Sequence, residues 1–149
     1  MRSKQMMVMI MALTTMLSCV SAFAEVKSVK PVPQVFRGKW VMPIYGVTLD
    51  NKRLLQACKG GLKDKVQLLT ISPNGKSITS RYANGHVYEF EILGYDKYTA
   101  MHISGQMNLL ATESGDESLE GEGFSYMIKQ NKLYVKEDGE DLVFSKCPK

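Results

Sequence analysis

Cysteine is the residue type in this chain whose spacing most clearly predicts chemistry, namely a disulfide bond. The chain has 149 residues and three cysteines, of which Cys19 falls within the first 24 residues. Those residues combine a basic start, an apolar run over 6–17 and a small-x-small site at 22–24, the pattern of a cleavable secretory signal peptide. Once Cys19 is removed in an oxidising compartment, the remaining pair, Cys58 and Cys147, is predicted to form a disulfide.

The same segment predicts where the protein goes. Cleavage after Ala24 would release a mature chain beginning at Glu25, in the periplasm or outside the cell. Residues 16–19 loosely match a lipobox, so a lipoprotein anchored at Cys19 is the minor alternative. No transmembrane segment is expected in the mature chain, because no apolar run reaches the roughly 20 residues that a spanning helix needs.

Residue types suited to catalysis or metal binding are few. The two histidines, His86 and His102, are predicted on adjacent strands and could share a site. However, no motif supplies a nucleophile, and the cysteines and histidines lack metal-ligand spacing. We therefore predict no catalytic residue, no metal site and no cofactor, and interpret the protein as non-enzymatic.

Five carboxylates crowd a polar loop over 113–123, a density that can hold Ca²⁺. Their spacing matches no EF-hand, so a solvated loop is favoured over a metal site. The five are Glu113, Asp116, Glu117, Glu120 and Glu122.

Basic residues gather in the first half of the mature chain. Residues 25–82 contain 11 Lys and Arg against 3 Asp and Glu, whereas residues 83–149 contain 6 against 12. A basic patch could face an anionic partner, or a closed fold could mix the two halves and compensate the charges. Nucleic acid is not an expected partner, because no stacking aromatics interleave with the basic residues. The predicted patch comprises Lys52, Arg53, Lys59, Lys63 and Lys65.

The elements that must position these residues are mostly strands. Residues 25–35 predict an extended lead-in, and 36–42 a first strand stopped by Pro43. One short helix is predicted near 50–59, capped by Asp50 or Asn51 and directing Cys58 toward the core. Short apolar segments between turn signals then predict further strands. These are 66–72, 77–82, 86–92, 97–103, 107–112, 124–128, 132–135 and 142–144.

Consecutive hairpins make antiparallel neighbours, and a long meander tends to close on itself. We therefore predict an all-β fold over 36–149: a single antiparallel up-and-down β-barrel of about eight strands with one short helix. A two-sheet sandwich is the alternative.

Phe36-Arg37-Gly38-Lys39-Trp40, at the first strand of this exported meander, resembles the Gly-x-Trp signature of lipocalin-like barrels. The resemblance implies that Trp40 packs at the narrow end of the barrel. It also implies that a basic side chain from the final strands, Lys136 or Lys146, lies over the indole ring. A small apolar or amphipathic ligand in the barrel mouth would be the corresponding function.

Aromatic side chains could line such a cavity or fill the barrel solid. The predicted ligand-binding set is Trp40, Tyr82, Tyr88, Phe90, Phe124 and Tyr126, and Phe144 belongs to the same aromatic group. In the alternative function, a solid barrel uses its turns at 73–75, 83–85 and 113–123 as an inhibitor or immunity-type protein against a periplasmic hydrolase.

Overall fold

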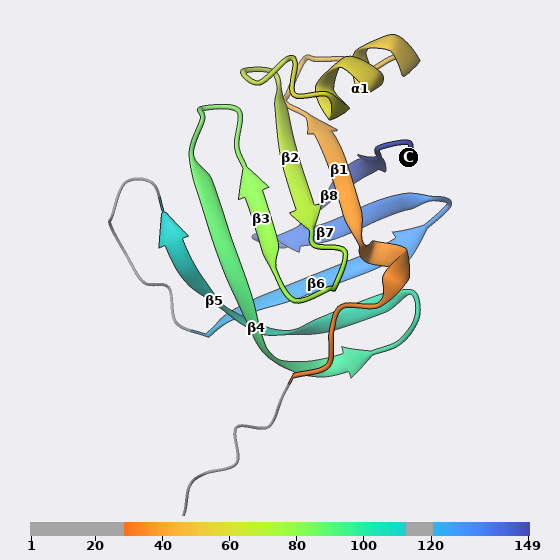
Figure 1. Cartoon of the computed structure of the whole chain (residues 1–149). Helices are drawn as coiled ribbons and strands as arrows, with labels where there is room; N and C mark the ends of the chain where they lie inside the picture. Colours follow the sequence, from red (N-terminus) through yellow and green to blue (C-terminus); the bar gives the residue numbers. More distant parts are fainter. Residues whose placement is uncertain (1–28, 113–120) are drawn as a thin grey trace, which may run out of the picture.

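Residues 29–112 and 121–149 are described by a computed structural model of the chain, drawn in Figure 1. The predicted signal peptide, with Cys19, and the acidic residues Glu113, Asp116, Glu117 and Glu120 lie outside these ranges. Eight strands form one closed barrel. They are β1 (Gly38–Pro43), β2 (Val66–Ile71), β3 (Ile78–Arg81), β4 (Val87–Tyr98), β5 (His102–Thr112), β6 (Glu122–Lys129), β7 (Lys132–Glu137) and β8 (Glu140–Lys146).

Every strand pairs antiparallel with the next one along the chain, and β1 closes the barrel against β8. The closing ladder is short, with Trp40 opposite Lys146 and Val41 opposite Ser145. The prediction of an all-β up-and-down barrel of eight strands with one short helix is therefore confirmed.

The break predicted between the strands at 86–92 and 97–103 is wrong, because β4 continues through residues 93–96 to Tyr98. Gly94 and Gly105 are instead the point where β4 and β5 come closest. A side chain on Gly105 would collide with the carbonyl of Gly94, and the ladder shifts register on either side of Gly94. Glycine inside a strand often marks a bulge or close backbone approach rather than a turn. These irregularities accompany the bend of the long β4–β5 pair seen in Figure 1.

The N-terminal lead-in lies across one end of the barrel, hereafter the closed end. It ends in a short 3-10 helix, η1 (Gln34–Phe36), so the first strand begins at Gly38 rather than at the predicted Phe36. Phe36 is instead fully buried against the barrel core. The Val32 N–H donates to Gly75 O (2.8 Å) in the β2–β3 turn, and Tyr98 donates to Pro31 O (2.9 Å).

A glycine is required in that β2–β3 turn. Gly75 has φ +69°, and a side chain there would lie 2.6 Å from the carbonyl oxygen of Val32. Arg37 joins the same two segments, donating from Nε to Val32 O (2.8 Å) and from Nη1 to Pro73 O (2.9 Å). The turn predicted as a contact loop at 73–75 is therefore built into the closed end.

The predicted helix is present as α1 (Asn51–Cys58), between β1 and β2. Asp50 caps it by accepting from the Arg53 N–H (2.8 Å). Cys58 was predicted to point toward the core, but the apolar face of α1 does not enter the barrel core. It packs on the outer surface instead, in a small cluster centred on Val41, Ala57 and Val66. No helix of the described ranges is long and apolar enough to cross a membrane.

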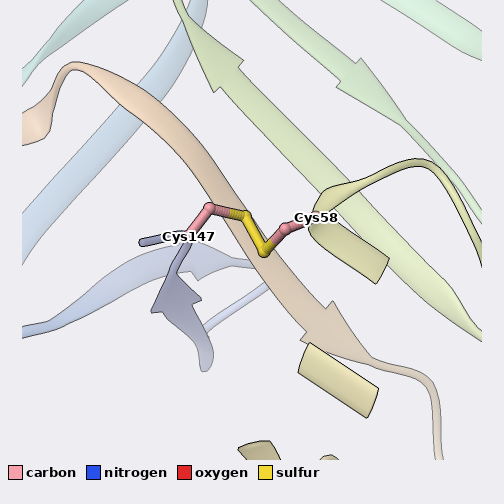
Figure 2. Close-up of a disulfide and its surroundings, with 2 residues drawn as sticks. All are labelled: Cys58 and Cys147. Carbon is pink, nitrogen blue, oxygen red and sulfur yellow. A yellow bond between two sulfur atoms is a disulfide. The ribbon is translucent and has the colours of Figure 1, made fainter. Parts of the chain in front are cut away.

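The predicted disulfide links α1 to the segment after β8. Cys58 and Cys147 are bonded, with Cα atoms 5.7 Å apart and a sequence separation of 89. Figure 2 shows the bond joining α1 to the segment after β8 near β1, and both cysteines pack against the cluster centred on Val41. The Cys147 N–H donates to Lys39 O (2.9 Å), so the disulfide and the β1–β8 seam support each other.

Candidate functional site

A cavity of about 560 Å³ occupies the barrel end opposite the lead-in, hereafter the open end. The turns β3–β4 and β7–β8 border this end. Its apolar lining comes from strands all around the barrel, because every second residue of a strand faces inward. The apolar and aromatic members are Leu69, Tyr82, Phe90, Met107, Phe124, Tyr126, Val135 and Phe144.

A buried polar pair lies in the cavity wall. Gln67 is 8 % exposed and Ser80 is 3 % exposed, and the Gln67 side-chain amide donates to Ser80 Oγ (3.0 Å). Both residues occupy inward positions that neighbouring strands fill with apolar side chains. A buried polar group needs a hydrogen-bond partner, and Gln67 and Ser80 are each other's partner. Both side chains also line the cavity.

Tyr126 places a second polar group in the wall. Its side chain is 3 % exposed, and its hydroxyl makes no hydrogen bond to any residue in the described ranges. Burial raises the pKa of Tyr126, with Tyr82 and Glu137 adding to the shift. Burial also raises the pKa of Tyr82, again reinforced by Glu137. Two phenols and one carboxylate therefore lie close together in the cavity.

Carboxylates crowd the rim of the cavity. Glu122, Glu137 and Asp138 all line it. Partial burial raises the pKa of Glu137, and repulsion from Asp138 and Glu122 raises it further. The sole cationic lining residue in the described ranges, Lys136, lies between the inward positions Val135 and Glu137. It therefore belongs to the outer face of β7, opposite Asp141 of β8.

The predicted ligand-binding aromatics divide between the two ends of the barrel. Tyr82, Phe90, Phe124 and Tyr126 line the cavity, as does Phe144. Tyr88 packs edge-on against Tyr82, with ring centroids 5.3 Å apart, and its ring lies 6.4 Å from that of Phe90.

Trp40 does not line the cavity. It is 1 % exposed in the closed-end core, and its indole N–H donates to Phe36 O (2.7 Å). Of the two cations implied by the family resemblance, Lys146 is the one over the indole, with Nζ 4.9 Å from the ring centroid. The same Nζ donates to Val35 O (2.8 Å), so Lys146 ties β8 to the lead-in.

The histidines do not share a site, although they were predicted close enough to do so. His86 precedes β4 at the open end, whereas His102 begins β5 at the closed end. His102 Nε2 lies 3.2 Å from Ser125 Oγ. Its pKa is lowered by desolvation and by the nearby cations Lys97 and Lys129. Among the described residues, no group of three His, Cys, Asp or Glu side chains is arranged to hold a metal ion.

The predicted basic patch lies outside the barrel. Its members are all exposed, on α1 or on the segment between α1 and β2, and none lines the open-end cavity. A separate groove of about 680 Å³ runs beside the disulfide, and Lys59 contributes to it together with Arg37, Lys39, Lys146 and Lys149. The members are Lys52, Arg53, Lys59, Lys63 and Lys65.

Sequence reasoning missed the polar lining of the cavity. Gln67 and Ser80 interrupt otherwise apolar inward positions, and this break in the alternation was the available signal. Glu137 gave no signal of its own, because it meets Tyr82 across the cavity only once the barrel is closed.

Comparison with known proteins finds no matching family model, no matching curated sequence and no matching solved structure.

Proposed function

We propose that this protein is an exported, non-enzymatic barrel of lipocalin-like type that binds a small apolar or amphipathic ligand in its open end. The observation that carries the proposal is the open-end cavity. Its volume of about 560 Å³ falls within the range of roughly 300–1,000 Å³ that small-molecule sites occupy. Its wall combines apolar and aromatic side chains with converging polar groups, and polar groups of this kind can fix the orientation of a ligand.

Export is supported by the chemistry of the cysteines. The bond between Cys58 and Cys147 fits an oxidising compartment such as the periplasm. The mass of the protein recovered from cells expressing the full chain tests this part. A mature chain starting at Glu25 is expected, whereas a lipidated Cys19 or an intact N-terminus would contradict cleavage after Ala24.

A non-enzymatic role is supported by the separation of the two histidines. His102 has Ser125 as its side-chain neighbour, and the cavity itself contains no histidine among its described lining residues. The polar groups that converge there are an amide, hydroxyls and carboxylates, which suit recognition of a ligand.

Ligand binding is tested with N-phenyl-1-naphthylamine, a neutral apolar probe whose fluorescence rises in an apolar site. We expect saturable enhancement with the purified protein. Val135→Trp should abolish it by filling the cavity, since Val135 lines the wall. Val143→Trp is the matched control, because Val143 is 39 % exposed on the neighbouring strand β8.

Both variants must retain the wild-type circular dichroism spectrum for the comparison to count. Probe binding that survives Val135→Trp, or that is absent in the wild type, would overturn the cavity proposal.

The alternative function, inhibition of a hydrolase through surface turns, has less support. It assumed a solid barrel, and the open end is hollow. Two of its turns also lie at opposite ends: 73–75 is packed under the lead-in, whereas 83–85 borders the open end. The third, 113–123, lies mostly outside the described residues.

A further inference from the structure

The open end carries more chemistry than an apolar ligand would need. Glu122, Glu137 and Asp138 are held together on the β6–β8 side of the rim, where their mutual repulsion is unfavourable. Like charges collected at a cavity mouth attract ligands of the opposite sign and lower the electrostatic cost of the site when the ligand binds.

Tyr126 provides an independent indication of a ligand. Its side chain is nine-tenths buried or more, it lines the cavity, and its hydroxyl has no hydrogen-bond partner in the described ranges. A hydroxyl of the cavity wall that lacks a protein partner is available to bond to water or to a ligand group in the cavity. A ligand group that donates hydrogen bonds would satisfy the oxygen of Tyr126 and the carboxylate of Glu137 together.

Together, the rim and the inner wall require a ligand whose two ends differ in chemistry. The rim needs a positive group with N–H donors, whereas Leu69, Phe90 and Phe124 offer an apolar surface to the remainder. A metal ion does not meet these demands, because the described carboxylates are not grouped to ligate one.

We propose that the open-end cavity binds a protonated alkylamine or arylalkylamine, with its ammonium group between Glu137, Tyr82 and Tyr126 and its apolar portion on the inner aromatic walls. This inference rests on the proposed function and specifies the ligand class. The aromatic ring of Tyr82, which lines the cavity, would add cation–π attraction to the ammonium group.

The test displaces N-phenyl-1-naphthylamine from the purified protein with ligands sharing one decyl chain, each kept below its micelle-forming concentration. Decylamine, protonated at pH 7, should displace the probe at the lowest concentration. Decyltrimethylammonium has the charge without N–H donors and should be weaker, and decyl sulfate should be the weakest. Equal displacement by decylamine and decyl sulfate would overturn the inference.

Variants separate charge from hydrogen bonding. Glu137→Gln should weaken decylamine and decyltrimethylammonium alike, by about fivefold, the upper range for a rim charge pair. Tyr126→Phe should weaken decylamine by about tenfold and leave decyltrimethylammonium unchanged. Glu140→Gln is the matched control: Glu140 lies opposite Glu137 but does not line the cavity, so its variant should match the wild type.

The possible failures are distinguishable. If the probe binds but Glu137→Gln and Tyr126→Phe leave decylamine affinity unchanged, the amine inference is wrong and the binding function stands. If neither the probe nor any decyl ligand binds the wild-type protein, the proposed function itself is wrong.

Discussion

The two ends of this barrel are built from the same alternating strands but are finished in different ways. At the closed end, the lead-in and η1 cover the core, and Val32, Phe36, Trp40, Ile71 and Ile103 are each at most 1 % exposed. At the open end, buried and half-buried aromatics, a phenol without a hydrogen bond to another described residue, and repelling carboxylates surround a hollow. We therefore expect side chains of the closed end to contribute more to stability than the half-buried side chains of the open end, where we propose that a ligand binds.

The largest expected effect comes from breaking the closed end. Trp40→Ala removes a fully buried side chain and its hydrogen bond to Phe36, and should lower the free energy of unfolding by about 3–5 kcal/mol. Phe90→Ala at the open end is the control and should lower it by only about 1–2 kcal/mol, because that ring is half-buried. Urea unfolding curves measure both, and equal losses would refute the contrast between the ends.

Removing the disulfide should have the next largest effect. Cys58→Ser combined with Cys147→Ser releases a closure spanning 89 positions and should lower the free energy of unfolding by about 2–5 kcal/mol. Chemical denaturation of the oxidised protein and the double variant measures the loss. Because the bond lies outside the barrel, probe binding in the open end should persist while the variant remains folded. Binding lost before unfolding would show that the two regions are coupled.

A smaller loss is expected from the cation over Trp40. Lys146→Met removes the contact with the indole and the hydrogen bond to Val35 O, together about 1–2 kcal/mol. Lys129→Met is the matched control, because Lys129 is an exposed cation over Tyr134, 5.6 Å from the ring centroid, and its loss should be a few tenths of a kcal/mol. Thermal unfolding at fixed pH compares them, and indistinguishable melting temperatures would assign Lys146 no special role.

The smallest change in the free energy of unfolding should come from a substitution at the open end, and it should be a gain rather than a loss. The pKa of Glu137 is raised in the folded protein, so folding favours its protonated form and stability is lost as pH rises through that pKa. Glu137→Gln should therefore stabilise the protein near pH 7, by up to about 0.5 kcal/mol for so exposed a group. The gain should vanish as pH falls below the ordinary range of a glutamate. A gain that is independent of pH would exclude repulsion at the rim as its cause.

Much of the barrel was predictable because its determinants are local. Alternation located most strands, the turn sequences located most hairpins, and the isolated cysteine pair identified the disulfide. The prediction failed at Gly94 and Gly105, where glycine marks a close approach between two paired strands rather than a turn. That distinction depends on which strand lies opposite, and a single segment does not contain this information.

The cavity was less predictable for the same reason. Most of its aromatic members could be named from their strand positions, but Trp40 was also named as a ligand-binding residue and does not line the cavity. Glu137 meets Tyr82 and Tyr126 only through the curvature of the closed sheet. Pairing between distant strands therefore determines the cavity chemistry, and residue type alone indicates only which side chains are available.

The seam between β1 and β8 has a consequence for the order of events during synthesis. β1 is the first strand to leave the ribosome, whereas its second neighbour, β8, is the last. Cys58 likewise cannot form its disulfide until Cys147 has been synthesised. Early strands can form hairpins as they emerge, but the barrel cannot close until β8 has been synthesised and can pair with β1. We therefore expect barrel closure and oxidation to be late, post-translational steps, with β1 and β8 as temporarily exposed edges that are vulnerable to pairing with other chains.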